Sequence, residues 1–148
     1  MEHHIQKSEV LPYTPEQVYS LVADVERYPE FLPWCKGARI KDSNQGVIAK
    51  LTVGYGPLST SFTTRTRNEP GKEIRIALVE GPFERLEGAW HFRSQNEEKT
   101  RISLDLRFQF ADHGLGALFN SVFEKAMEKI LDAFKERARS LYGSPDTD

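Results

Sequence analysis

The sequence predicts an α+β fold in which one curved antiparallel sheet wraps around a long C-terminal helix. Residues 101–110 alternate between polar and apolar side chains, which predicts a strand with one wholly apolar face. After a short turn, an amphipathic stretch from Leu115 to Tyr142 predicts a helix with one apolar stripe. Because each of these elements needs a partner for its apolar side, we expect the sheet to pack onto the helix.

Two short helices are expected between the first strand and the rest of the sheet. The first strand spans residues 3–11 and ends at a turn. Thr14 is expected to cap the next helix, with Pro15 at its first position, because a threonine hydroxyl accepts from the free backbone N–H groups there. Residues 27–34 contain two prolines, which favours a short helical turn over a regular element.

Six further strands are expected between residues 35 and 110. Turn-forming residues recur at 43–46, 54–57, 68–71, 81–83 and 94–98. The intervals are strands of about eight to ten residues, and the short gaps between them favour hairpins. The predicted order is therefore one strand, two short helices, six strands and a final helix.

Composition sets limits on the class of protein. The chain has 148 residues, a formal net charge of -2 and one cysteine. We expect one domain over residues 1–142 and a polar tail at 143–148. The slight negative charge argues against a general affinity for nucleic acid, so no DNA partner is expected. With no secretory signal, no membrane-length apolar run and no internal disulfide, the expected location is cytoplasmic.

The two faces of the predicted sheet differ in character. Inward positions carry apolar side chains, with Thr60, Thr64 and Thr66 as a polar minority. Helix and sheet could fill the interior solidly or leave an elongated apolar cavity, and residue type alone does not decide between these alternatives. Outward positions carry a row of arginines, which are Arg65, Arg67, Arg75, Arg85, Arg93, Arg101 and Arg107.

Four segments carry a resemblance to a known family. They cover residues 11–19, 24–35, 62–65 and 78–92, and include Tyr-Pro-x-Phe-Leu-Pro-x-Cys at 28–35 and Gly-Pro-Phe-x-x-Leu-x-Gly-x-Trp-x-Phe at 81–92. The chain thereby resembles the RatA and coenzyme Q-binding proteins, within the polyketide cyclase-like, START-type helix-grip superfamily. The resemblance implies a helix-grip fold and a ligand-sized cavity between the sheet and the C-terminal helix.

The resemblance implies two functions and does not choose between them. One is non-enzymatic binding of a polyprenyl quinone, coenzyme Q, as a lipid chaperone that supports respiration, with transient contact to a membrane surface left open. The alternative is a RatA-type toxin that binds the large ribosomal subunit and blocks subunit association. In the second case the outward arginines are the candidate RNA contacts, although such arginines can also simply solvate a sheet and pair with scattered carboxylates.

For the first function, apolar walls are expected to hold the isoprenoid tail, while Thr64 or Tyr19 near the mouth orients the quinone head. Phe31 and Leu32 are expected to form a rigid lip, with ordinary packing as the alternative. The predicted cavity residues are Tyr19, Phe31, Leu32, Leu51, Phe62, Thr64, Ile76, Leu78, Trp90, Leu104, Leu106, Phe119, Val122, Phe123, Ala126 and Ile130.

Catalysis is not expected from the sequence. Strand parity turns His91 outward, the N-terminal strand holds His3 and His4, and His113 lies in a turn. No histidine has a partner at a spacing that indicates a metal site or a nucleophile. Cys35 is expected to be a small buried residue. We therefore predict no catalytic residue, no metal, and no cofactor other than a quinone bound as a ligand.

Overall fold

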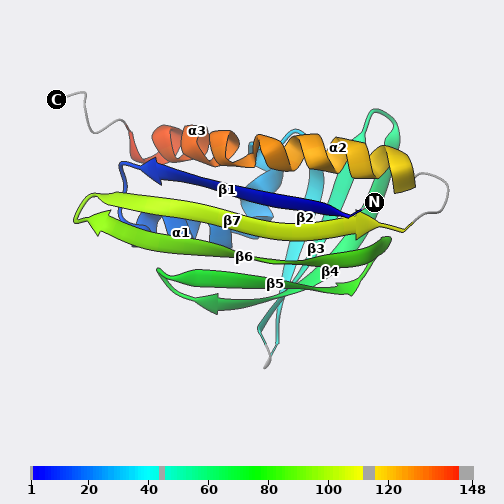
Figure 1. Cartoon of the computed structure of the whole chain (residues 1–148), viewed down its shortest axis with the longest axis horizontal. Coiled ribbons are helices and arrows are strands. Elements are labelled where there is room, and N and C mark those ends of the chain that lie inside the picture. Colours follow the sequence, from blue (N-terminus) through cyan, green and yellow to red (C-terminus); the bar gives the residue numbers. More distant parts are fainter. Residues whose placement is uncertain (1, 44–45, 112–115, 144–148) are drawn as a thin grey trace.

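The computed structural model describes residues 2–43, 46–111 and 116–143. One sheet contains all the strands, and helices cover its concave face (Figure 1). The elements are β1 (His3–Leu11), α1 (Pro15–Ala23), the 3-10 helix η1 (Val25–Glu30), β2 (Cys35–Ser43), β3 (Gly46–Tyr55), β4 (Leu58–Glu69), β5 (Glu73–Glu80), β6 (Phe83–Asn96), β7 (Lys99–Phe110), α2 (Gly116–Glu128) and α3 (Ile130–Tyr142). The predicted α+β class is confirmed, and so is the order of elements from β1 to β7.

The seven strands lie in the order β1-β7-β6-β5-β4-β3-β2, and every neighbouring pair is antiparallel. The two helices after β1 carry the chain to the far edge, where β2 begins the meander. Strands β4 and β7 have 12 residues and β6 has 14, so these three are longer than the strands of about eight to ten residues predicted from the turns. Register shifts add an extra residue to β2, β5 and β6 and bend these strands, since a bulge adds local twist.

The start of α1 follows the predicted cap. Thr14 Oγ1 accepts a hydrogen bond from the Gln17 backbone N–H at 3.2 Å, and Gln17 Oε1 accepts from the Thr14 backbone N–H at 2.9 Å. This reciprocal pair satisfies two donors that a helix end leaves free. The helix is thereby fixed with its buried residues Val18, Leu21 and Val22 toward the sheet.

The predicted single C-terminal helix is divided into two. Lys129 interrupts the helix with φ -109° and ψ 3°, and its N–H bonds the Ala126 carbonyl three residues back at 3.2 Å. The apolar stripe continues across the break, which is why sequence periodicity did not reveal it. The predicted start at Leu115 and the turn at His113 lie outside the described residues.

Two aromatic clusters fill the ends of the interior between sheet and helices. The first joins the rings of Phe62, Phe83, Phe108 and Phe110 to that of Phe123 in α2, with centroid distances of 4.8 to 6.2 Å to Phe123. The second joins Tyr28, Phe31 and Trp90 to Phe134 in α3, at 5.3 to 5.5 Å. The described part of the chain contains no helix long and apolar enough to cross a membrane.

Candidate functional site

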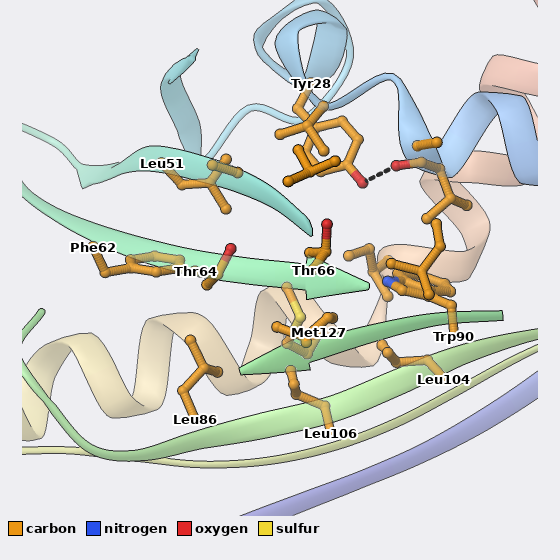
Figure 2. Close-up of a pocket in the computed structure, with 18 of the residues that line it drawn as sticks. Tyr28, Leu51, Phe62, Thr64, Thr66, Leu86, Trp90, Leu104, Leu106 and Met127 are labelled. Atoms are coloured by element: carbon orange, nitrogen blue, oxygen red, sulfur yellow. Dashed lines mark hydrogen bonds between the residues drawn. The ribbon is translucent and has the colours of Figure 1, made fainter. Parts of the chain in front are cut away.

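The interior between the two aromatic clusters is hollow. A cavity of about 320 Å³ lies between β2–β7, α1, η1 and the α2–α3 junction (Figure 2). Its lining is Val22, Ala23, Val25, Tyr28, Trp34, Ile40, Val47, Ala49, Leu51, Phe62, Thr64, Thr66, Asn68, Ile74, Ile76, Leu86, Trp90, Leu104, Leu106, Phe123, Met127 and Ile130. The sequence left open whether the interior is filled or hollow. In the structure aromatic side chains pack its two ends, and the cavity lies between them.

Short side chains on neighbouring strands create this space. Ala49 on β3 pairs directly with Thr64 on β4, and Thr66 pairs with Val47. Ala49 and Thr64 are 2% and 4% exposed. Because none of these side chains reaches the helices opposite, they leave a gap that a larger residue would fill. The cavity is therefore a consequence of residue size in the sheet.

The cavity reaches solvent on the side of η1. Asn68 is the exposed residue of the lining, while Val25, Ile40 and Val47 are half-buried near it. The opposite end is closed by Phe62, Leu86 and Phe123, which are buried. A ligand would therefore enter between η1 and strands β2–β4.

Tyr28 holds η1 over the cavity. Its hydroxyl donates to the Val22 carbonyl of α1 at 2.5 Å, and burial raises the pKa of this phenol above its ordinary value. Tyr28 is thus a neutral side chain at physiological pH, with its proton already engaged. It is the one titratable side chain in the lining, which otherwise contains none of Asp, Glu, Lys, Arg, His or Cys among the residues described.

A salt bridge fixes η1 against α3. Arg137 donates to Glu30 at 2.8 Å, and its guanidinium lies 4.9 Å from the centre of the Phe31 ring. Hydrogen bonds from Arg137 and Arg27 lower the pKa of Glu30, so the carboxylate stays charged at neutral pH. This contact holds η1, which covers one side of the cavity, against α3.

Nine of the sixteen predicted cavity residues lie in the lining. They are Leu51, Phe62, Thr64, Ile76, Trp90, Leu104, Leu106, Phe123 and Ile130. All but Phe123 and Ile130 stand on strands, where an alternating pattern fixes which face a side chain occupies. Whether these residues contact a ligand is a prediction that binding experiments have to test.

Three predicted residues of α2 lie elsewhere. Phe119, Val122 and Ala126 border a separate gap of about 10 Å³ beside Trp34. The sequence analysis predicted Ala126 as a cavity residue, but Met127 is the residue of this turn that lines the cavity. The buried residues of α2 recur every four positions, at Phe119, Phe123 and Met127, and Val122 and Ala126 are half-buried beside them.

Four further predicted residues lie outside the lining. Tyr19 packs edge-on against Phe92, with ring centres 5.6 Å apart. Leu78 is half-buried beside Gly81. The expected lip residues belong to the packing instead: Phe31 is part of the second aromatic cluster, and Leu32 is 1% exposed.

The lining also contains thirteen residues that were not predicted as cavity residues. Several of them, including Ala49, Thr66 and Leu86, have the inward parity of the predicted residues, so strand alternation contained the signal. Val25, Tyr28 and Trp34 come from η1 and the segment after it, which has no periodicity to analyse. The thirteen are Val22, Ala23, Val25, Tyr28, Trp34, Ile40, Val47, Ala49, Thr66, Asn68, Ile74, Leu86 and Met127.

The outer face of the sheet is hollowed where the predicted arginines gather. One concavity of about 550 Å³ has Arg65, Arg67, Arg75 and Arg107 in its lining. A second, of about 420 Å³, includes Arg93 and Arg101. Register places Arg67 directly opposite Arg75, and Arg93 directly opposite Arg101. Like charges in such positions repel each other unless neighbouring groups compensate them.

Some of these arginines are neutralised and others are not. Arg75 pairs with Glu73 at 2.8 Å, while Arg85 and Arg107 share Glu2 at 3.1 and 3.5 Å. Arg101 donates to the Ser8 hydroxyl. Among the described residues, no carboxylate pairs with the three others, which are Arg65, Arg67 and Arg93. The row therefore contains arginines that pair with carboxylates and, among the described residues, three that do not; whether any of them contacts RNA stays a prediction.

The remaining candidate groups lie away from the cavity. His4 and His91 contact Asp105 and Glu73 at 2.8 and 3.4 Å on the outer face of the sheet. His3 lies between β1 and α2, where its ring stacks on Phe108 and contacts Glu124 at 2.6 Å. Within the described ranges, no three His, Cys, Asp or Glu side chains gather in a metal-binding arrangement. Cys35 is buried and burial raises the pKa of its thiol, which disfavours the reactive thiolate.

Comparisons with known proteins agree with this geometry. Residues 11–135 match the family model described as polyketide cyclase / dehydrase and lipid transport. The ribosome association toxin RatA of Pseudomonas aeruginosa is 42% identical over 97% of this chain and 100% of its own length. The mitochondrial coenzyme Q-binding protein COQ10 homolog B of Xenopus laevis is 28% identical over 93% of this chain and 58% of its own. The crystal structure of the Zhui aromatase/cyclase from Streptomyces sp. R1128 superposes with a TM-score of 0.81 at 19% identity, covering 98% and 99% of the two chains.

Proposed function

Because this chain belongs to the RatA and coenzyme Q-binding protein family, within the polyketide cyclase / dehydrase and lipid transport family, we propose that it binds a hydrophobic ligand between its sheet and C-terminal helices. The observation that carries the proposal is the cavity of about 320 Å³, whose lining is almost wholly apolar. Burial of apolar surface there would stabilise a bound ligand by about 25 cal/mol per Å².

A polyprenyl quinone is the favoured ligand, because a relative over most of the chain is named for binding coenzyme Q. Such a ligand resides in membranes, so a carrier of it has to contact a membrane surface transiently. The proposed role is that of a lipid chaperone supporting respiration, performed in the cytoplasm by one domain over residues 1–142.

The binding is proposed to be non-enzymatic. Acid–base chemistry needs a group that exchanges a proton near neutral pH, and nucleophilic catalysis needs an activated side chain. The described lining offers only Tyr28, whose raised pKa and bond to Val22 oppose both roles. Aromatase/cyclases share the fold, but 19% identity supports no transfer of their chemistry.

Native mass spectrometry after gentle purification, followed by lipid extraction, tests this proposal. We expect a co-purifying neutral lipid. Stripped protein should then bind added short-chain quinones with quenching of tryptophan emission, because Trp34 and Trp90 both line the cavity. Protein that carries no lipid, and whose emission no quinone changes, would contradict the proposal.

We propose association with the large ribosomal subunit as a second candidate function. Two observations favour it: the relative named as a ribosome association toxin, and the outer arginine face with its directly opposed like charges. Ribosomal RNA presents a dense array of phosphates, which guanidinium groups bind through paired hydrogen bonds. Arg67 and Arg93 are exposed and have no carboxylate partner among the described residues, so they are available for such contacts.

Replacing Arg67 and Arg93 together with glutamate is expected to weaken co-sedimentation with large subunits by about tenfold or more. Wild-type binding should fall log-linearly as salt rises, because each neutralised phosphate releases a counterion, and the variant should have a shallower slope. Lys125→Glu with Arg139→Glu is the matched control, since it makes the same change in net charge on α2 and α3. Equal loss in both variants would indicate a net-charge effect and contradict the assignment of the face.

A further inference from the structure

We infer that the ligand carries an uncharged hydrogen-bond acceptor, such as a carbonyl oxygen, and that this polar end lies inside the cavity at Thr64, Thr66 and Trp90. The inference deepens the proposed ligand-binding function and rests on it. It follows from three properties of the cavity: its free donors, its lack of charge and its size.

The first property is a set of polar groups that face the cavity without partners. Thr64 and Thr66 are 4% and 9% exposed, and their hydroxyls point into the space below Tyr28 (Figure 2). Trp90 is 5% exposed and lines the same space with its indole. In the part of the chain that the structure describes, neither the two hydroxyls nor the indole N–H has a hydrogen-bond partner.

These hydroxyls and the indole N–H discriminate between ligands, because a buried polar group without a hydrogen bond costs free energy. An indole N–H can only donate, and a threonine hydroxyl can donate or accept. A pure hydrocarbon would bury these donors without replacing their bonds to water, whereas a carbonyl oxygen accepts from them. The cavity therefore favours a ligand with an acceptor over one of the same shape without it.

The second property is the absence of charge. The described lining has no cation that could balance a carboxylate or phosphate, and its one phenol stays neutral. Burying an unpaired anion in such surroundings is strongly unfavourable. A free fatty acid or a phospholipid head group is therefore excluded from the interior.

The third property is capacity. A cavity of about 150 Å³ is enough to hold benzene, so 320 Å³ holds roughly one substituted ring and a few further atoms. A long polyprenyl tail does not fit. The buried positions of Thr64 and Thr66 place the polar end inside, and the tail leaves past Asn68 at the open side. This orientation is the reverse of the one expected from the sequence, which put the head at the mouth.

The test compares three probes by isothermal calorimetry on lipid-free protein: a tail-less dimethoxy-methyl benzoquinone, an alkylbenzene of matched size and a benzoate of matched size. We expect the quinone to bind wild-type protein at least about tenfold more tightly than either of the others. Thr64→Val and Thr66→Val remove one hydroxyl each at constant shape and should each weaken the quinone about five- to tenfold. Thr60→Val, on the same strand but outside the lining, is the control and should bind like wild type.

The outcomes separate this inference from the function on which it rests. If no probe binds, the proposed ligand-binding function fails. If the alkylbenzene binds as tightly as the quinone, or both valine variants bind the quinone normally, the function stands and the buried acceptor is wrong. Tight binding of the benzoate would contradict the neutral ligand. The comparison of probes on wild-type protein decides the matter even if a variant does not fold.

Discussion

Replacing Ala49 with phenylalanine is expected to abolish ligand binding while leaving the fold intact. Ala49 is 2% exposed on β3 and lines the cavity beside Thr64. A benzene ring needs a cavity of about 150 Å³, close to half of the available space, so the quinone ring no longer fits beside the new side chain. We expect affinity for the tail-less benzoquinone to fall by about 100-fold or more, measured by calorimetry.

The thermal stability of the Ala49→Phe protein should not fall with its affinity for the quinone. Filling an existing void adds packing contacts, so we expect the melting temperature of Ala49→Phe to equal or exceed that of the wild type. Ala77→Phe is the matched control, because Ala77 lies on the outer face of β5 and should leave binding unchanged. A folded Ala49→Phe protein that binds the quinone normally would place the ligand elsewhere. Ala126 is unsuited to this test, since it borders only the gap of about 10 Å³.

The sheet was predictable because its register is fixed by alternation. A shift of one residue turns every apolar side chain to solvent, so the pattern at 101–110 has one stable placement, and β7 buries its even-numbered residues from Thr100 to Phe110. The first strand and the cap at Thr14 followed from equally local rules. The bulges and the helix break at Lys129 depend on tertiary packing between distant elements, which the local sequence pattern does not reveal.

Seven of the nine predicted residues that line the cavity lie on strands. Parity turned Phe62, Thr64 and Leu104 toward the interior, where they line the cavity, because a strand has two faces and one of them was apolar. Successive helix residues point about 100° apart, so the apolar pattern did not settle whether Ala126 or its neighbour Met127 lines the cavity. Tyr28 comes from a short 3-10 helix whose position over the cavity is set by its bond to Val22 and not by any periodic pattern.

Replacing Phe134 with alanine is expected to cause the largest loss of stability, about 3 to 5 kcal/mol. Phe134 is fully buried, and its ring centre lies 5.5, 5.3 and 5.3 Å from those of Tyr28, Phe31 and Trp90. Deleting it removes apolar burial and leaves a void that three rings from different elements cannot all collapse into. Urea unfolding should show the loss directly, and the melting temperature should fall by about 10 °C.

Phe31→Ala is the matched comparison, because it removes a second ring from the same aromatic cluster. Phe31 is half-buried at the edge of the same cluster, so its loss should cost clearly less than that of Phe134. Because Tyr28 and Trp90 line the cavity and both rest on Phe134, the Phe134→Ala protein should also bind the quinone more weakly at temperatures where it remains folded. Equal stability losses for the two variants would mean that the cluster is loosely packed. The Arg137–Glu30 salt bridge, rather than aromatic packing, would then hold η1 over the cavity.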